Sequence, residues 1–364
     1  MQADAFISPH LGASVLLNGL IFAHHIWGHL DADEKRQLRA VGRGVRALVD
    51  DLVVTVTMQA KSLAAADLGA ALARWPNVQT LSADCDVHSA AVISAAPLSK
   101  LKALLLEHTG GDAEWIVSAL SHTAAAGLER LHLVGQYPHP IVSIESVRDC
   151  TQLRKLSLKA CKARTLGPLA GCVHLEELAA SEVMGRDITP VGSCAKLKKL
   201  ALWGDEVSDL TPLQGCVELQ DLNISRCTQL VSLQGLEALS KLQCLYMYGC
   251  ERVSSLEVLP ACSELKHLNI GLCVSVANLS PLSACRQLEH LDIALCMGLT
   301  SLAPLSACAN LKKLNMGYCT GVASVEPLAA CARLEQLRIG GLTEPLPGMD
   351  ALVTALPQLR IVRQ

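Results

Sequence analysis

Apolar and polar residues alternate in short segments that recur along most of the chain. From residue 219 the segments follow one another every 23 residues and read "LQDLNISRC", "LQCLYMYGC", "LKHLNIGLC", "LEHLDIALC" and "LKKLNMGYC". Upstream, "LRKLSLKAC" at 153, "LEELAASEV" at 175 and "LKKLALWGD" at 197 are spaced by 22 residues, and further copies begin at 49, 78, 101, 128, 334 and 356. Self-similarity at a fixed period of about 20 to 50 residues indicates a repeat architecture. Residues 49–364 are therefore predicted to form one array of thirteen or fourteen repeats.

The repeated segment resembles the leucine-rich repeat, L-x-x-L-x-L-x-x-N/C, and its second half, as in "LTSLAPLSAC", resembles the 22-residue class found in internalins. The resemblance implies an α/β solenoid, a curved rod with a parallel sheet on its concave face. The convex face would carry turns or 3₁₀ segments, which tolerate the prolines. Two longer early units, "AADLGAALARW" and "AEWIVSALSHTAAAG", predict true helices on the convex side.

Fourteen of the sixteen cysteines fall into two columns of this repeat. Six follow the second strand leucine by five residues, at the N/C position: Cys161, Cys227, Cys250, Cys273, Cys296 and Cys319. Eight precede the first leucine of the next strand by three residues: Cys150, Cys172, Cys194, Cys216, Cys262, Cys285, Cys308 and Cys331. Leu239 occupies that place in one repeat, so the column needs a small apolar filler. Thiols spread along a rod do not converge on a zinc ion, and we expect no disulfides.

Residues 1–48 do not fit the repeat, and their apolar spacing predicts two or three short helices. This segment resembles an F-box in the spacing of Ile26, Leu30, Asp31, Leu38, Arg39, Val41, Arg43 and Arg46. The resemblance implies that Ile26, Leu30, Leu38 and Val41 contact a Skp-type adaptor, which in turn binds a cullin. The alternative is an amphipathic cap that covers the first hydrophobic face of the solenoid.

Composition narrows the possible partners and the compartment. Hydrophobic residues make up 51% of the chain, aromatic residues only 3%, and the formal net charge is −3. An aliphatic core is therefore expected, and binding to nucleic acid or to a membrane surface is not. No Lys or Arg precedes Lys35, and the apolar run near residue 20 is interrupted by polar residues. We expect an intracellular protein, in the cytoplasm or the nucleus.

Candidate chemistry is sparse in the sequence. Cys244 and His267 occupy equivalent positions in neighbouring repeats and could meet across the sheet, but no oxyanion-binding group accompanies them. His25 and His29 are four residues apart without the glutamate of a zinc-protease motif. The sequence therefore predicts no enzyme, no metal and no cofactor.

Residues immediately before, immediately after and three residues after the second strand leucine should point outward onto the concave face, because side chains alternate along a strand. Trp203, Tyr246 and Tyr248 occupy such positions within three consecutive repeats, and aromatic residues are enriched at the centres of interfaces. The same face carries hydrogen-bonding side chains beside them: Asn223, His267, Asn269, His290, Asp292 and Asn315. These nine residues are the predicted partner-binding site, although the two tyrosines could also simply pair with their neighbours across the sheet.

Two functions fit this organisation. In the first, the F-box-like segment recruits a ubiquitin ligase through an adaptor and a cullin, while the concave face captures a protein or peptide substrate. In the second, the chain is a stand-alone scaffold or regulatory subunit, and residues 1–48 form only the cap of the solenoid. Both predict a protein-binding module.

Overall fold

The structure is a computed structural model that describes residues 55–59, 77–85, 99–108, 127–135, 140–181, 187–204, 206–342 and 346–363. The F-box-like segment lies outside the described residues. So do residues 65–75 and 113–126, where the sequence predicts two helices.

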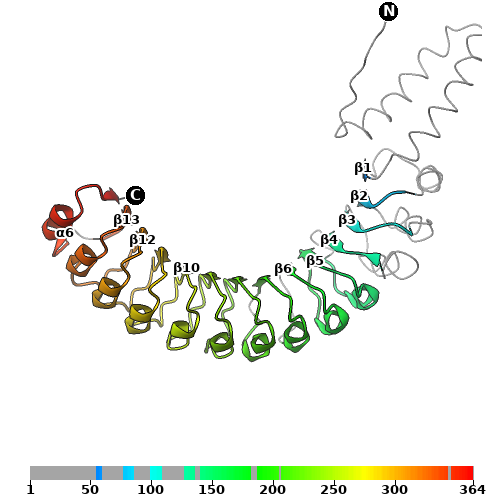
Figure 1. Cartoon of the computed structure of the whole chain (residues 1–364), viewed down its shortest axis with the longest axis horizontal. Helices are drawn as coiled ribbons and strands as arrows, with labels where there is room; N and C mark the ends of the chain where they lie inside the picture. The colour runs from blue at the N-terminus through cyan, green and yellow to red at the C-terminus, as the bar shows by residue number, and fades with distance from the viewer. Residues whose placement is uncertain are drawn as a thin grey trace, which may run out of the picture.

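Fourteen strands form one parallel sheet in which each strand pairs with the next along the chain. The strands lie on the inner side of a curved rod and the helical turns on its outer side (Figure 1). The first seven contain five or six residues: β1 Thr55–Gln59, β2 Thr80–Cys85, β3 Ala103–His108, β4 Arg130–Val134, β5 Lys155–Lys159, β6 Glu177–Ser181 and β7 Lys199–Trp203. The remaining seven contain three: β8 Asp221–Asn223, β9 Cys244–Tyr246, β10 His267–Asn269, β11 His290–Asp292, β12 Lys313–Asn315, β13 Gln336–Arg338 and β14 Arg360–Val362.

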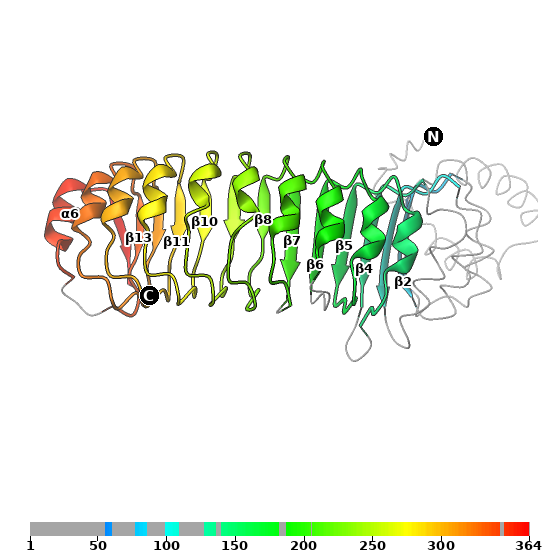
Figure 2. The same cartoon turned by 90° about the horizontal axis from the view of Figure 1, so that it is seen from below.

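The outer side of the later coils consists of single 3₁₀ turns, as the proline-containing segments predict. They lie side by side in a row along the rod (Figure 2). Proline stands in the first turn of seven of the nine, where a missing N–H costs nothing because that N–H has no partner within the helix. The turns are η3 Glu145–Asp149, η4 Gly167–Gly171, η5 Thr189–Ser193, η6 Thr211–Gly215, η7 Leu236–Ala238, η8 Leu259–Ala261, η9 Ser280–Ala284, η10 Ala303–Ala307 and η11 Glu326–Ala330.

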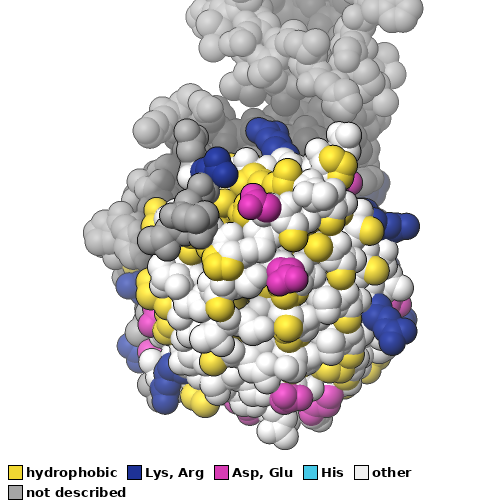
Figure 3. All heavy atoms as spheres, turned by 90° about the vertical axis from the view of Figure 1, so that its left-hand side faces the viewer, with side chains coloured by type: hydrophobic (Ala, Val, Ile, Leu, Met, Phe, Trp, Pro, Cys, Tyr) yellow, Lys and Arg dark blue, Asp and Glu magenta, His cyan; other side chains and the backbone are white. Residues whose placement is uncertain are grey.

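The last coil differs from the others because an α-helix, α6 (Met349–Ala355), takes the place of the 3₁₀ turn. Leu352 of this helix is fully buried, while Val353 is exposed. Seen from this end, apolar side chains are interspersed with polar and charged ones (Figure 3). Leu352 thus joins the core cluster that the leucines of the preceding coils form.

The core is a stack of leucine ladders and cysteine columns. In the described coils the second strand leucines face one another directly, as in the run Leu222, Leu245, Leu268 and Leu291. All fourteen cysteines of the two predicted columns are buried, and none of them is in a disulfide. This confirms that they are core residues of the repeat. The stacking of identical small side chains keeps neighbouring coils close together.

Each thiol of the N/C column from Cys227 to Cys319 donates to a backbone carbonyl of the preceding coil. Cys296 Sγ lies 3.0 Å from Ile270 O, and Cys319 Sγ lies 2.9 Å from Ile293 O. Burial raises the pKa of Cys296 to about 12, so the thiol stays protonated and able to donate. The cysteine is therefore a small apolar filler that also satisfies a turn carbonyl.

The first and last strands are displaced from the frame that the sequence pattern predicts. Val56 lies opposite Leu81 where the pattern places Leu52, and Ile361 lies opposite Leu337 where it places Leu359. Shifts of four and two residues keep the same side chains on the same face, so periodicity alone does not detect them. At the C-terminus the cause is visible, because the seven residues of α6 bring the chain back to the sheet two residues later.

Candidate binding surface on the concave face

The polar residues at the ends of the short strands are bound to their own backbone. Asn223, Asn269, Asp292 and Asn315 each use Oδ1 to accept the N–H of the residue two positions on, at 2.9 to 3.3 Å. That N–H would otherwise point toward the preceding strand and extend the ladder, so the side chain ends the strand in its place. Four of the predicted binding residues thus have a structural role on the concave face.

Asp292 is the most fully engaged of the four. Its Oδ1 accepts the backbone N–H of Ala294 at 3.0 Å, and its Oδ2 accepts Nδ2 of Asn315 at 2.9 Å. Both carboxylate oxygens therefore have a donor within the protein.

His267 and His290 lie side by side on β10 and β11, and their Nδ1 atoms are 2.8 Å apart. The rings meet edge to face with centroids 4.4 Å apart. One ring must donate and the other accept across this contact, so at most one of the two is charged while the contact lasts. Burial, together with the neighbouring His267 and Lys313, lowers the pKa of His290 below its ordinary value.

Cys244 and Tyr246 share the outward face of β9 and are hydrogen-bonded to each other. Burial, and then the charge of Asp221, raises the pKa of the Cys244 thiol. His267 lies directly across on β10, but no hydrogen bond joins it to Cys244 among the described residues. A protonated thiol without a base is a poor nucleophile.

The other two predicted aromatic anchors differ in their surroundings. Trp203 is 42% exposed at the end of β7. Tyr248 is half-buried, and its ring lies over Gly271 of the next coil, where an added Cβ would come within 3.0 Å of Cδ2. Tyr248 therefore covers a glycine of its neighbour, and Trp203 does not have this constraint.

Two grooves hollow the concave face and meet at Tyr246. The N-terminal groove, about 610 Å³, runs over β3 to β9, and Ser157, Ala179 and Ala201 contribute small side chains to its floor. The C-terminal groove, about 350 Å³, runs over β9 to β13. Six of the nine predicted residues line the C-terminal groove: Tyr246, His267, Asn269, His290, Asp292 and Asn315. Asn223 joins Tyr246 in the N-terminal groove, and Trp203 and Tyr248 line neither.

The prediction omitted the charged residues of both grooves. Arg130, Lys155, Glu177, Lys199 and Asp221 line the N-terminal groove, and Lys313 and Arg338 line the C-terminal groove. These residues occupy the same outward columns as the predicted ones. The signal was therefore present in the sequence, in the excess of Lys and Arg over Asp and Glu in those columns.

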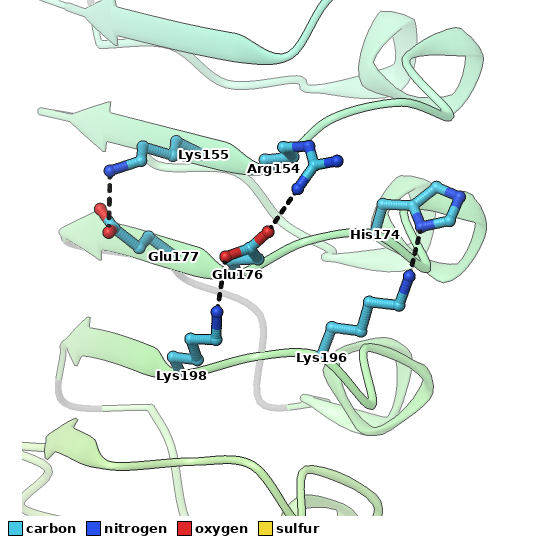
Figure 4. A network of polar contacts seen from close by, with 7 residues as sticks. All are labelled: Arg154, Lys155, His174, Glu176, Glu177, Lys196 and Lys198. Carbon is cyan, nitrogen blue, oxygen red and sulfur yellow. Dashed lines mark hydrogen bonds and ion pairs between the residues drawn. The ribbon is translucent and has the colours of Figure 1, made fainter.

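A ladder of ion pairs follows the amino-terminal ends of the strands beside the grooves (Figure 4). Glu176 accepts from Arg154 at 2.7 Å and from Lys198 at 2.9 Å, and so bridges three consecutive coils. Lys155 and Glu177 pair at 2.8 Å on the concave face itself. The Lys198 and Arg154 contacts lower the pKa of Glu176, which keeps the carboxylate charged at neutral pH.

Neither metal-binding nor membrane-spanning features occur in the described part of the chain. No group of three or more His, Cys, Asp or Glu side chains there could hold a metal ion. No helix there is long and apolar enough to cross a bilayer.

Comparison with solved structures identifies the fold. An internalin from Listeria monocytogenes is similar with a TM-score of 0.69 and 17% identity, over 91% of this chain and 94% of that one. A leucine-rich repeat protein from Leptospira interrogans is similar with a TM-score of 0.55 and 13% identity, over 84% of this chain and 81% of that one. The chain folds as a leucine-rich repeat solenoid. Neither a protein-family model nor a curated protein sequence matches it.

Proposed function

We propose that this leucine-rich repeat chain is a non-enzymatic module that binds an extended segment of another protein along its concave face. The observation that carries the proposal is the continuous hollow over β3 to β13, which Tyr246 divides into two grooves. The hollow crosses ten strand-to-strand steps of about 4.8 Å each, and so offers roughly 48 Å of surface. Concave surfaces of this kind are what solenoids use to bind partners.

The local chemistry supports binding rather than catalysis. Among the cysteines whose burial the structure describes, only Cys244 is not fully buried, and its raised pKa makes the thiol unreactive. The small side chains of Ala179 and Ala201 leave room for a ligand backbone to approach the sheet. An amphipathic aromatic such as Tyr246 is a suitable anchor at the point where the grooves meet.

The test is a matched pair of substitutions in the full chain, Ala201→Arg in the N-terminal groove and Ala195→Arg on an exposed turn outside both grooves. Partners are first captured from cell extract with the unmodified protein, and then purified and measured directly against each variant. Ala201→Arg should abolish binding by filling the groove, and Ala195→Arg should leave it unchanged. Equal binding by both variants would exclude the N-terminal groove, and with it a bound segment that occupies the whole hollow.

The ubiquitin-ligase role implied by the F-box-like segment stays a prediction, and so does the alternative of a stand-alone scaffold or regulatory subunit. If the ubiquitin-ligase role is correct, the double variant Leu30→Arg with Leu38→Arg in the full chain should no longer capture a Skp-type adaptor and a cullin. If residues 1–48 are only a cap, the unmodified chain and the double variant should capture the same proteins, and ligase components should be absent from both. The predicted cytoplasmic or nuclear location is checked in the same cells by fractionation.

A further inference from the structure

Positive charge gathers on the concave face although the whole chain has a formal net charge of −3. The relevant positions lie immediately before, immediately after and three residues after the second strand leucine of β4 to β13. These outward columns hold six cations and three carboxylates, a formal excess of three positive charges: Arg130, Lys155, Lys159, Lys199, Lys313 and Arg338 against Glu177, Asp221 and Asp292. The face that would meet a partner is thus opposite in sign to the chain as a whole.

Each groove has a formal excess of one positive charge, but an ion pair, Lys155 with Glu177, lies only in the N-terminal groove among the described residues. Lys313 on β12 and Arg338 on β13 are exposed in the C-terminal groove, and neither side chain has an ion-pair or hydrogen-bond partner among the described residues. The one carboxylate of this groove, Asp292, already accepts from Ala294 and Asn315. One ammonium and one guanidinium group therefore remain available to a ligand.

The histidine pair adds to this cationic character. Because the Nδ1 atoms of His267 and His290 contact each other, the Nε2 atoms are the ring nitrogens available to a ligand. The charged groups that act on His290 are His267 from β10, Lys313 from β12, Lys312 immediately before β12, and Glu289 immediately before its own strand. Glu289 is itself paired with Lys312 at 2.6 Å, so positive charges dominate around His290, while Asp221 acts on His267.

A row of apolar side chains borders the groove at the carboxyl-terminal ends of the strands. Leu272, Leu295 and Tyr318 adopt positive φ angles of 58°, 64° and 60°. The equivalent positions in the flanking coils are Gly249 and Gly341, which adopt this conformation without strain. Ala160 and Arg226 adopt the same conformation at this position of earlier coils, so the positive φ belongs to the repeat, and a non-glycine residue there costs about 1 kcal/mol or more.

Two large apolar side chains in this region are exposed, while Leu272 and Leu295 are half-buried. Tyr318 is 55% exposed, and Met297, two residues beyond Leu295, is 56% exposed. We call Leu272, Leu295, Met297 and Tyr318 the apolar rim. Small residues separate the rim from the groove on the same coils: Gly271, Ala294 and Gly317. A ligand chain in the groove can therefore reach Leu295 and Tyr318 past Ala294 and Gly317 without crossing a bulky side chain, whereas the ring of Tyr248 covers Gly271.

We propose that the C-terminal groove binds an extended, acidic segment of a partner protein, with a large apolar side chain seated on the apolar rim. Lys313, Arg338 and the histidine pair would bind its carboxylates. The inference rests on the proposed function and specifies its ligand. Nucleic acid is the weaker candidate, because Asp221 and Asp292 lie on the same face and the rim is uncharged. Four strand-to-strand steps from β9 to β13 span roughly 19 Å, the length of about six extended residues.

The test uses a library of random peptides of about nine residues, displayed and selected on the full chain. Selected peptides should combine Asp or Glu with a large apolar residue. Their affinities are measured by fluorescence anisotropy, beside versions in which each Asp or Glu is replaced by its amide. The amide versions should bind at least about tenfold more weakly than the acidic peptides. The affinity of the acidic peptides should also fall at least about tenfold when the NaCl concentration rises from about 50 to 300 mM.

Matched variants locate the site. The double variant Lys313→Gln with Arg338→Gln should bind the acidic peptides at least about tenfold more weakly than the unmodified chain does. Lys241→Gln with Arg333→Gln removes the same charge outside both grooves and should change affinity less than about twofold. Equal losses in the two double variants, selection of non-acidic peptides, or no selection at all would overturn the inference. If the selected peptides are non-acidic and the Ala201→Arg variant no longer binds them, the inference about an acidic ligand is overturned, but the proposed function still holds.

The rim is tested by a substitution that the local backbone conformation accommodates. Leu295→Gly removes the side chain at a position with φ of 64°, where glycine is unstrained. Its melting temperature should stay at or near that of the unmodified chain, and affinity for selected peptides should fall about fivefold or more. Unchanged affinity would remove the apolar rim from the proposal.

Discussion

The two halves of the concave sheet share one core but differ in one outward column. In β5 to β7 the residue after the second strand leucine is Ser157, Ala179 or Ala201, and each strand has five residues. In β8 and β10 to β12 the residue is Asn or Asp, its oxygen accepts a backbone N–H two residues on, and each strand has three residues. An Asn or Asp side chain thus ends four of the seven short strands, whereas β9, β13 and β14 are equally short with Tyr246, Arg338 and Val362 at this position.

The comparison also explains the two grooves. Small side chains leave the N-terminal groove larger, at about 610 Å³, and its Lys155 is already paired with Glu177. Polar side chains fill part of the C-terminal groove, at about 350 Å³, but its Lys313 and Arg338 remain unpaired among the described residues. The N-terminal groove therefore mainly offers room for the backbone of a ligand. The C-terminal groove mainly offers charged groups that can bind the side chains of a ligand.

The largest expected effect should be the same in both halves. Leu178→Ala and Leu268→Ala each remove a fully packed ladder leucine, at 1% and 2% exposure. Each should lower the free energy of unfolding by about 2 to 5 kcal/mol. Urea unfolding followed by circular dichroism measures both. A large difference between the two would mean that the halves differ in their cores and not only in the outward column.

The next largest loss of folding stability is expected for Asp292→Ala, which lies in the half with short strands. It removes the acceptors of the Ala294 N–H and of Asn315 Nδ2, at a cost of about 1 to 3 kcal/mol. Ser157→Ala, at the equivalent column position of β5, should cost less than about 0.5 kcal/mol. The same unfolding assay compares them, and equal costs would contradict a structural role for the Asx column.

The affinity for a ligand should depend on pH in the short-stranded half, which contains His290. Burial and the nearby His267 and Lys313 hold the pKa of His290 below its usual range, so the ring is largely neutral near pH 7. A bound carboxylate raises that pKa, so binding takes up a proton and affinity increases as the pH falls from about 7.5 to 5.5.

Anisotropy titrations across that range, with the unmodified chain and His290→Gln, measure this effect. The variant should show a flatter dependence. An affinity that falls with decreasing pH would contradict the sign of the linkage.

The smallest effect is expected at the ion-pair ladder of the long-stranded half. Glu176→Gln removes the contacts with Arg154 and Lys198, which are largely exposed, and should cost less than about 1 kcal/mol. The depressed pKa of Glu176 means that its contribution exists at neutral pH and is lost as the pH falls through the acidic range. Stability measured at pH 7 and in added salt checks this, because salt should erase the difference between variant and unmodified chain.

Much of the fold follows from the period of the sequence. The spacing of leucines and cysteines predicts the solenoid, the parallel sheet, the 3₁₀ turns and the buried thiols, because each coil must bury the same positions against its neighbours. The strand ends were less predictable, since hydrogen bonds of Asn223 and Asp292 to their own backbone compete with the ladder. The first and last strands were placed wrongly because an even shift preserves the alternation of faces.

The concave positions of the candidate site were accessible from sequence, but the state of each side chain was not. The repeat columns alone place Tyr246, His267 and His290 on one face of the sheet. Only the folded chain brings Nδ1 of one histidine to 2.8 Å from Nδ1 of the other, and places the ring of Tyr248 over Gly271. These contacts depend on rotamers and on the curvature of neighbouring coils, which periodicity does not encode.

The sequence by itself determined which residues are inside, because burial of apolar surface acts on every repeat alike and needs only the correct spacing. The tertiary structure decided which polar residues are engaged and which are free. Asp292 and Lys313 belong to equivalent outward columns, yet the first has donors on both oxygens and the second has no partner among the described residues. A hydrogen bond or an ion pair requires particular atoms at particular distances, and those distances exist only after the coils have stacked.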